Sequence, residues 1–510
     1  MMKETIIISS DKTYTSKFTF KERVKQYSFS SRFINFGWFL FVLSCSIFFA
    51  FLITQFGVVS GILILLTILG MPIIYGFIVY PKFGIIVFLF SAYFIMFIFR
   101  LDLGDYPFGT VMDFMQLLLI IGFFIKQKQR MDWKILKGPI STIILIWILF
   151  NLLEVINPAA ESKLAWVYTV RSVAVVMLMY FVFLYNIQTK AFIKIIFKLW
   201  ISLSLFAALY GLKQQFIGFT DFENKYLYSD PKIAGLLFIG GQWRKFSIFS
   251  DPVAFSYNMV ISSLLCIGLA TGPVKKFQKW MLWIIGLICL FSMLYSGTRG
   301  AYVLIPAAMI LFAILKFNKK VVIVSVLFGL LLAAVVFMPT SNPTIYRFQS
   351  AFRPTEDASF NVRKQNQKRI QPFILSHPMG GGLGATGTWG SRFSPNSMLA
   401  KFPPDSGYVR VAVEMGWIGL FLFCLLMFTI LRVGIHHYFA IKDPTLKSYC
   451  LAMILIIFAL NIGNYPQEAL VQFPSNVYFF LVTALIEVTY RLDLANKIDE
   501  HSLISTNDFR

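Results

Sequence analysis

The residue of this sequence that is best placed for chemistry is an arginine between two long apolar segments. Arg299 lies in the short turn 296–301, which reads SGTRGA. A charge so close to hydrocarbon is costly and normally faces a cavity or a partner. The glycines of the turn let other backbone segments approach, and the amides at the start of the following helix would also favour an anion. The alternative is an arginine that extends its charge to the membrane surface.

Further basic side chains gather in two long stretches between apolar segments, residues 214–247 and 339–408. The first stretch carries Arg244 and Lys245. The second stretch and its end carry Arg347, Arg353, Arg363, Lys364, Lys368, Arg369, Arg392, Lys401 and Arg410. Arginine suits phosphate because its planar guanidinium gives two parallel charge-assisted hydrogen bonds and stays protonated. The pattern predicts an anion-binding cavity; a solvated basic surface that touches lipid head groups is the alternative.

The apolar segments predict that the chain crosses a membrane many times. Of the 510 residues, 57% are hydrophobic and 14% charged, with a mean hydropathy of +0.71, whereas soluble chains are close to half apolar. We predict an all-α polytopic membrane protein with about 12–14 transmembrane helices and one large, partly helical periplasmic loop. The predicted spans are residues 36–56, 58–80, 83–99, 107–125, 139–155, 170–187, 193–213, 248–270, 280–296, 300–316, 320–338, 409–431, 448–465 and 474–490.

The shorter basic loops determine the predicted orientation. Lys and Arg accumulate in cytoplasmic loops, and placing both termini in the cytoplasm collects most of these loops on that side. Topology then explains the formal net charge of +22, and nucleic acid is not an expected partner. The predicted regions are a cytoplasmic basic N-terminal segment (1–35), transmembrane helices about 1–11 (36–338), a large periplasmic loop (339–408), the last transmembrane helices (409–490) and a cytoplasmic tail (491–510).

The large loop 339–408 is predicted to contain a helix of its own. Asp357 or Ser359 can cap a helix that begins near Phe360, and Pro378 ends it. The glycine-rich stretch 380–384 then predicts a tight turn or a mobile segment.

Four short motifs surround this loop. They are residues 244–252 (RKFSIFSDP), 295–301 (YSGTRGA), 377–384 (HPMGGGLG) and 414–420 (EMGWIGL). Their order and spacing resemble those of the bacterial O-antigen ligase and polymerase family over roughly residues 240–435. In the family's motifs, Gly stands at the place of Ser247, and Ser is common at the place of Thr298.

The resemblance implies a membrane glycosyltransferase. Family members move a glycan from an undecaprenyl-diphosphate carrier to an acceptor at the periplasmic face of the bacterial inner membrane. Ligases use lipid A-core as the acceptor, and polymerases use a second lipid-linked glycan; both activities remain open. Membrane lipids are the other expected partners. The residues fit an inverting transfer that calls for no metal and no cofactor, because arginines can stabilise the diphosphate leaving group.

The resemblance points to Arg244 and Arg299 as catalytic residues that bind the diphosphate. Arg363 and Arg369 are further candidate diphosphate ligands in the large loop, which would contribute catalytic and acceptor-site elements. On an ideal helix these two arginines point to well-separated faces, so we do not expect both to reach one phosphate group.

The remaining candidates concern the acceptor. Asp405 stands where ligases commonly carry a His, and it could deprotonate a hydroxyl or simply cap the next helix. His377 is a possible acceptor-site residue, although a turn position before Pro378 is the simpler interpretation. Arg410 and Glu414 are also possible acceptor-site residues, and their i,i+4 spacing favours an ion pair between them.

Two other function classes are alternatives to a transferase. A transporter or flippase of an anionic lipid-linked substrate would favour inverted repeats and charge at the membrane midplane. The sequence shows no repeat, and its basic residues gather in loops on one side. A scaffold protein would leave Arg299 unexplained.

Overall fold

The computed structural model describes residues 70–101, 108–131, 133–239, 241–353, 358–471 and 473–507, together with scattered positions between 43 and 55. The chain divides into two units, Met1–Ile74 and Tyr75–Arg510. All contacts given below belong to the second unit. The predicted N-terminal segment 1–35 lies outside the described residues, as do most of the spans predicted at 36–56 and 58–80.

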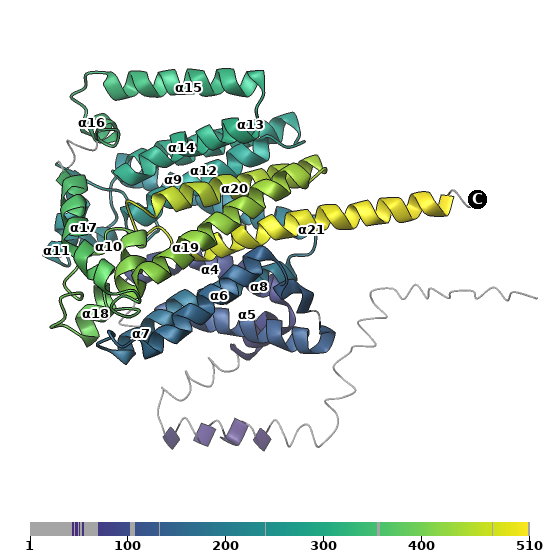
Figure 1. The fold of residues 1–510 in the computed structure, drawn as a ribbon, viewed down its shortest axis with the longest axis horizontal. Coiled ribbons are helices and arrows are strands. Elements are labelled where there is room, and N and C mark those ends of the chain that lie inside the picture. The colour runs from purple at the N-terminus through teal and green to yellow at the C-terminus, as the bar shows by residue number, and fades with distance from the viewer. Residues whose placement is uncertain are drawn as a thin grey trace, which may run out of the picture. The chain divides into compact units, whose positions relative to one another are not determined.

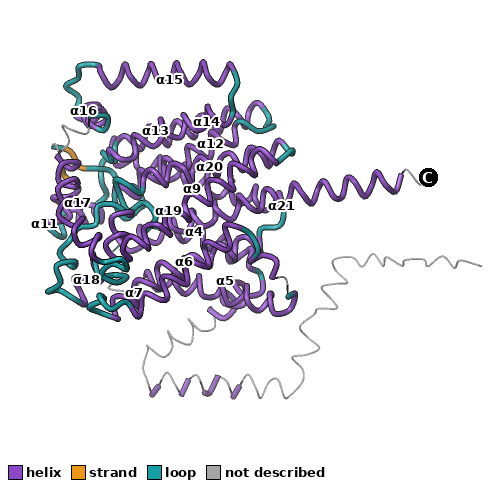
Figure 2. Tube along the Cα trace, viewed as in Figure 1, coloured by secondary structure: helices purple, strands orange, loops and turns teal. Residues whose placement is uncertain are grey.

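Ten helices in the described part of the chain are long and apolar enough to cross a membrane. The prediction of an all-α polytopic membrane protein is confirmed, and the helices follow the predicted apolar blocks closely (Figure 2). These spans are α4 (Pro81–Arg100), α5 (Phe108–Arg130), α6 (Pro139–Leu153), α7 and α8 (Lys163–Val170 and Val176–Asn186), α9 (Lys190–Phe216), α12 (Pro252–Ala270), α13 (Lys276–Leu294), α15 (Lys319–Phe337), α19 (Gly407–Ala440) and α20 (Pro444–Gly463). Two more helices are α14 (Arg299–Leu315), which is shorter, and α21 (Ser475–Asn507).

The connections between these helices hold several short elements. Figure 1 shows α10, α11, α16, α17 and α18 gathered at one end of the helices of the second unit, which we call the loop end. The short elements are η1 (Trp133–Leu136), η2 (Glu154–Ile156), η3 (Arg171–Val175), α10 (Asp221–Leu227), α11 (Pro231–Leu237), β1 (Phe238–Ile239), β2 (Gln242–Trp243), α16 (Pro343–Ser350), α17 (Ala358–Ser376) and α18 (Gly387–Phe393). The two strands pair antiparallel, with Phe238 opposite Trp243.

Helix α12 forms the centre of the helix packing. Nearly all of its residues are buried, and it packs against α13 and α20. Its polar side chains link it to other helices: the hydroxyl oxygens of Ser262 and Ser204 lie 2.7 Å apart, and Asn258 donates to Ser475 over 3.2 Å. Such hydrogen bonds join helices where hydrophobicity alone gives no preference for protein over lipid.

Helix α15 differs from α12 in both composition and contacts. Only 6% of its spanning window is buried, although it has the highest hydropathy of the ten spans. Figure 1 shows it at the edge of the second unit, beyond α14, which it contacts. Its apolar surface therefore suits direct contact with lipid.

The helix predicted inside the large loop is present as α17, and it ends two residues before Pro378, as expected from the proline rule. Of the two predicted caps, Asp357 lies outside the described residues. Ser359 lies inside the helix and not at its cap.

Candidate active site

The two arginine-bearing motifs lie directly against each other at the loop end. The Arg244 side chain donates from Nε to the carbonyl oxygen of Ser296 over 2.9 Å and from Nη2 to the hydroxyl of Thr298 over 3.0 Å. The backbone N–H of Lys245 donates to the carbonyl oxygen of Tyr295 over 3.0 Å. Arg244 thus reaches the turn that carries Arg299, although 54 residues separate it from Thr298.

Local chemistry explains why the first motif folds in this way. Ser247 has a φ of +53°, in the region that favours glycine, which is the residue of the family's motif at this place. Its hydroxyl donates to the carbonyl oxygen of Ala207 over 2.6 Å. Asp251 caps α12 by accepting from the backbone of Val253 and Ala254, and a proline follows it at the first helical position.

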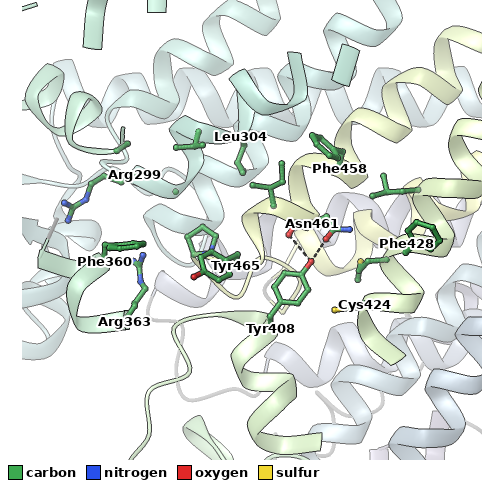
Figure 3. Close-up of a pocket in the computed structure, with 17 residues that line it drawn as sticks. Arg299, Leu304, Phe360, Arg363, Tyr408, Cys424, Phe428, Phe458, Asn461 and Tyr465 are labelled. Atoms are coloured by element: carbon green, nitrogen blue, oxygen red, sulfur yellow. Dashed lines mark hydrogen bonds between the residues drawn. The ribbon is translucent and has the colours of Figure 1, made fainter. Parts of the chain in front are cut away.

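The first of two cavities at the loop end is largely apolar, with a volume of about 750 Å³; we call it the apolar cavity. Figure 3 shows Arg299 and Arg363 at one end of this cavity and Phe428 and Phe458 toward the other. Its walls come from α14, α17, α19 and α20. The cavity therefore offers cationic groups at one end and hydrocarbon along the rest.

The second cavity is more polar and has a volume of about 610 Å³; we call it the polar cavity. Arg244, Arg299 and Arg347 all line it. Among the residues that the structure describes, Arg299 is the one arginine that lines both cavities. It is part-buried and is the first residue of α14. Because it lines both cavities, its side chain lies at their junction.

Arg347 is a site residue that the sequence did not single out. Its Nε donates to the carbonyl oxygen of Gly297 over 2.7 Å. Gly297 has a φ of +61°, and a side chain there would press against the Arg347 guanidinium. The sequence placed Arg347 in the basic loop but gave no motif around it, so nothing marked it as a neighbour of a turn 50 residues away.

Electrostatics in the polar cavity favour an anion. Burial, and after it the positive charge of nearby Arg347, lowers the pKa of the Arg244 guanidinium to about 10. Arg244 remains protonated at neutral pH, so like charges are held close together. An anion between them would relieve this repulsion.

Arg363 and Arg369 take different positions on α17. Arg363 lines the apolar cavity beside Phe360, whereas Arg369 is exposed and lines neither cavity. Their different positions agree with the expectation that the two arginines do not both reach one phosphate group, which stays a prediction. Of the four predicted diphosphate ligands, Arg244, Arg299 and Arg363 line the two cavities and Arg369 does not.

The other two motifs, residues 377–384 and 414–420, pack against each other. The glycine-rich turn of the first lies on a kink in α19, which carries the second. The kink is at Gly416, which has a φ of +67° and a ψ of −171°. The N–H groups of Gly381 and Gly382 donate to the carbonyl oxygens of Val413 and Glu414, each over 2.9 Å. A Cβ at Gly416 would overlap the carbonyl oxygen of Pro378, so glycine is needed for this close approach.

A partly buried ion-pair network holds this turn in place. Glu414 accepts from the backbone N–H of Gly384 over 3.1 Å and from the Thr386 hydroxyl. The predicted pair of Arg410 with Glu414 is confirmed, with an N–O distance of 3.2 Å. Arg410 also bonds Glu468 over 2.7 Å, a partner from the α20–α21 connection that the sequence did not suggest.

Residues 284–424, which carry three of the four motifs, match a family model described as O-antigen ligase. We call residues 284–424 the O-antigen ligase domain after this match. The match supports the family predicted from the motifs for this part of the chain, and the long apolar helices agree with a multi-pass membrane protein. No curated protein matches the sequence.

The O-antigen ligase domain supplies most of the arginines of the two cavities. Arg299, Arg347 and Arg363 lie inside the matched segment, whereas Arg244 lies 40 residues before it. The apolar cavity is completed by α20 and the connection after it, which follow the matched segment. The candidate site therefore extends beyond the ligase domain on both sides.

Asp405 and His377 lie at the surface of the ligase domain. Asp405 is exposed and lines neither cavity. The alternative that Asp405 caps the next helix is wrong, because Ser406 is the N-cap of α19 and accepts from the backbone of Val409. His377 stacks on Phe373, with 4.1 Å between ring centroids, and its Nδ1 lies 2.9 Å from the Ser376 hydroxyl. These contacts favour its interpretation as a turn residue.

Proposed function

We propose that this protein transfers a glycan from an undecaprenyl-diphosphate carrier to an acceptor hydroxyl, with inversion at the anomeric carbon and without a metal ion. The observation that supports this most is the position of Arg299. It stands between a cavity suited to a lipid chain and a cavity suited to polar groups. The diphosphate of a lipid-linked glycan is the group that must lie at such a junction.

The lipid chain is assigned to the apolar cavity. Its deep part is lined by Met427, Phe428, Leu431 and Phe458, from helices α19 and α20 that are long and apolar enough to span the membrane. A prenyl chain that enters the cavity from the bilayer would exchange contacts with lipid for contacts with these apolar side chains. The diphosphate would then reach Arg299 and Arg363 at the cationic end, and Arg244 from the adjoining cavity.

The proposed reaction is a single displacement. The acceptor oxygen attacks the anomeric carbon as the bond from that carbon to the diphosphate oxygen breaks, which inverts the configuration. The diphosphate leaves with the electron pair and gains negative charge, which fixed guanidinium groups stabilise more strongly than the ground state. We propose Asp405 as the base that takes the acceptor's proton. Because Ser406 caps α19, loss of the helix cap would not explain a loss of activity in Asp405 variants.

On the acceptor side, we propose that His377, Arg410 and Glu414 shape the site indirectly. Arg410 and Glu414 hold the turn around Gly384 through hydrogen bonds, and His377 begins that turn. The acceptor is either lipid A-core or a second lipid-linked glycan. The network would position the loop against which the acceptor binds.

We further propose that the loop end faces the periplasm and that both termini are cytoplasmic, in the inner membrane of a bacterium. Support comes from the helices that begin at the opposite end. Helices α9, α13 and α15 begin with Lys190, Lys276 and Lys319, as expected for cytoplasmic ends.

The test is a transfer assay with the full-length protein in lipid nanodiscs. The donor is an undecaprenyl-diphosphate-linked glycan, and the acceptor is lipid A-core or a second portion of the donor. Transfer that persists in EDTA and yields an inverted linkage supports the proposal. Attachment to lipid A-core identifies a ligase, and longer lipid-linked chains identify a polymerase.

The opposing result is equally clear. If neither acceptor is glycosylated and the labelled lipid-linked glycan instead crosses the bilayer of proteoliposomes, the protein is a transporter. Transfer that stops in EDTA and returns with added Mg²⁺ would overturn the metal-independent mechanism alone.

A further inference from the structure

The motif at residues 244–252 is held by side chains that lie outside the ligase domain and outside the four motifs. The amide of Gln214, near the end of α9, uses every hydrogen-bonding position that it has. Its oxygen accepts from the backbone N–H groups of Phe246 and Ser247 over 3.3 and 2.8 Å. Its nitrogen donates to the carbonyl oxygen of Ser247 over 3.3 Å and to the Glu223 carboxylate over 2.6 Å. Gln214 therefore fixes two consecutive residues of the motif.

Arg100 holds the same backbone from another helix. It is the last residue of α4, and only 6% of it is exposed. Its Nη2 donates to the carbonyl oxygen of Ser247 over 3.1 Å, while its Nη1 has no hydrogen-bond partner in the described part of the chain. The guanidinium lies over the rings of Phe246 and Tyr226, 4.5 and 5.9 Å from their centroids. A buried cation is costly unless it is compensated, and these aromatic faces supply part of the compensation.

These contacts explain how Ser247 keeps its positive φ of +53°. Its carbonyl oxygen accepts from both Arg100 and Gln214, and its hydroxyl donates to Ala207. A residue other than glycine stays in such a conformation only where its surroundings determine it strongly. We call Arg100 and Gln214 the Ser247 anchor.

The anchored backbone leads directly to Arg244. The residue between them in the chain, Lys245, is buried, and its Nζ lies 4.6 Å from the centroid of the Phe219 ring. That ring stacks on Phe246, with 5.6 Å between centroids. Arg244 then bonds the turn 296–298 through its guanidinium. A shift of the backbone at Ser247 would therefore move Arg244 against the turn that leads into Arg299.

We propose that Arg100 and Gln214 are positioning residues for glycan transfer, which act through Ser247 on Arg244 and on the turn that Arg244 bonds. Neither residue lines the apolar or the polar cavity, so neither is expected to touch the substrate. This inference rests on the proposed function, since the groups that the anchor positions form the proposed diphosphate site. A misplacement of about 1 Å at such a site can cost about 100-fold in rate.

The first experiment separates positioning from a purely structural role by kinetics of the full-length protein in nanodiscs. Arg100→Gln and Gln214→Glu should each lower kcat of the folded protein by about 100-fold, with KM for the lipid-linked donor unchanged because the apolar cavity is intact. Arg100→Lys should recover part of the rate, since an ammonium group can still donate to the Ser247 carbonyl oxygen and lie over the rings. If Arg100→Gln does not accumulate, the other two variants carry the same test.

The matched control is Ser262→Ala, which removes a buried hydrogen bond between α12 and α9 at a place remote from the anchor. Ser262 lies ten residues after Pro252 on α12, about 15 Å along the helix. This variant should lower Tm without lowering kcat. Anchor variants that behave in the same way, with a lower Tm and wild-type kcat, would overturn the inference.

The second experiment needs no activity and separates this inference from the proposed function. Backbone hydrogen exchange, measured by mass spectrometry, should be faster in Arg100→Gln than in the wild type for peptides that cover residues 244–250, and unchanged for residues 380–384. Unchanged exchange at 244–250 would overturn the inference even if the protein is a transferase. Faster exchange at 244–250 in a protein that transfers no glycan would sustain the anchor and defeat the proposed function.

Discussion

Two regions at the loop end are both built from paired motifs, and they use arginine in opposite ways. Around the two cavities, Arg244, Arg299 and Arg347 line open space, and no carboxylate lines it with them among the described residues. In the turn on α19, Arg410 is held between Glu414 and Glu468. The first region places positive charge on the walls of two cavities, and the second uses its charge to hold backbone in place.

The glycines of the two regions also differ in what surrounds them: backbone in the packed region, and an arginine side chain beside a cavity in the other. Gly416 and Gly380 lie so close together that a Cβ on either would overlap backbone of the other segment. A Cβ on Gly297 would meet the side chain of Arg347, next to a cavity. Motif residues near a cavity are thus candidates for chemistry, whereas motif residues in close packing are candidates for stability.

The largest effect is expected in the packed region. Gly416→Ala should prevent the accumulation of folded protein, because its combination of φ and ψ is essentially restricted to glycine and costs another residue about 1–3 kcal/mol, and the added Cβ overlaps the Pro378 carbonyl oxygen. Size-exclusion chromatography and thermal unfolding of the purified variant measure this. Gly329→Ala, where a Cβ on α15 meets nothing within 4 Å, is the matched control and should fold normally. A Gly416→Ala protein with wild-type thermal stability would break the comparison.

The next effect concerns the cavities. Arg299→Ala should lower kcat for glycan transfer by about 100- to 1,000-fold, the usual loss when one preorganised donor to a developing charge is removed. Its thermal stability should stay close to that of the wild type. Arg244→Ala should lose activity and stability together, since its guanidinium also bonds Ser296 and Thr298. If Arg299→Ala lowers the thermal stability but leaves the specific activity of the folded protein unchanged, Arg299 has a structural role like that of the residues in the packed region.

Asp405 tests whether chemistry extends beyond the cavity walls. Asp405→Asn should lower kcat by about 100-fold, the lower range for loss of a general base, with unchanged thermal stability because Ser406 caps α19. Ser406→Ala is the complementary variant: it should lower stability while specific activity remains. Wild-type kcat in Asp405→Asn would remove Asp405 from the mechanism.

The smallest effect separates two arginines of one helix. Arg363→Ala should weaken transfer about tenfold, as expected for one charged hydrogen bond, because Arg363 lines the apolar cavity. Arg369→Ala should match the wild type, since Arg369 is exposed and lines neither cavity. Equal losses in the two variants would mean that α17 contributes a diffuse positive surface and not a defined contact.

Much of this arrangement follows from local sequence patterns. Long apolar blocks determine the spans, as for the block at 193–213 that lies within α9 (Lys190–Phe216). The i,i+4 spacing of Arg410 and Glu414 predicted their ion pair. The six-residue spacing of Arg363 and Arg369 predicted their separation. These features depend on neighbours in the same helix, so the pattern of apolar residues and the spacing of charged residues predict them directly.

Other features depend on contacts between distant segments, and they were missed for that reason. Arg347 joins the site because α16 docks on a turn 50 residues earlier. Glu468 meets Arg410 across 58 residues, from a connection with no motif. The predicted span 409–431 includes Gly416 without a kink, because a glycine inside a helical pattern does not reveal a positive φ. The basic loops predicted an anion-binding cavity, but the presence of two cavities and the helices that line them result from packing and have no sequence signature.

The most direct test of the central claim is binding of the lipid head group. Wild-type protein and Arg299→Ala in nanodiscs are titrated with undecaprenyl diphosphate and with undecaprenyl monophosphate. If Arg299 holds the diphosphate at the junction of the two cavities, the wild type should prefer the diphosphate by about tenfold, and Arg299→Ala should bind the two lipids alike. A variant that keeps the full preference for the diphosphate would contradict the claim.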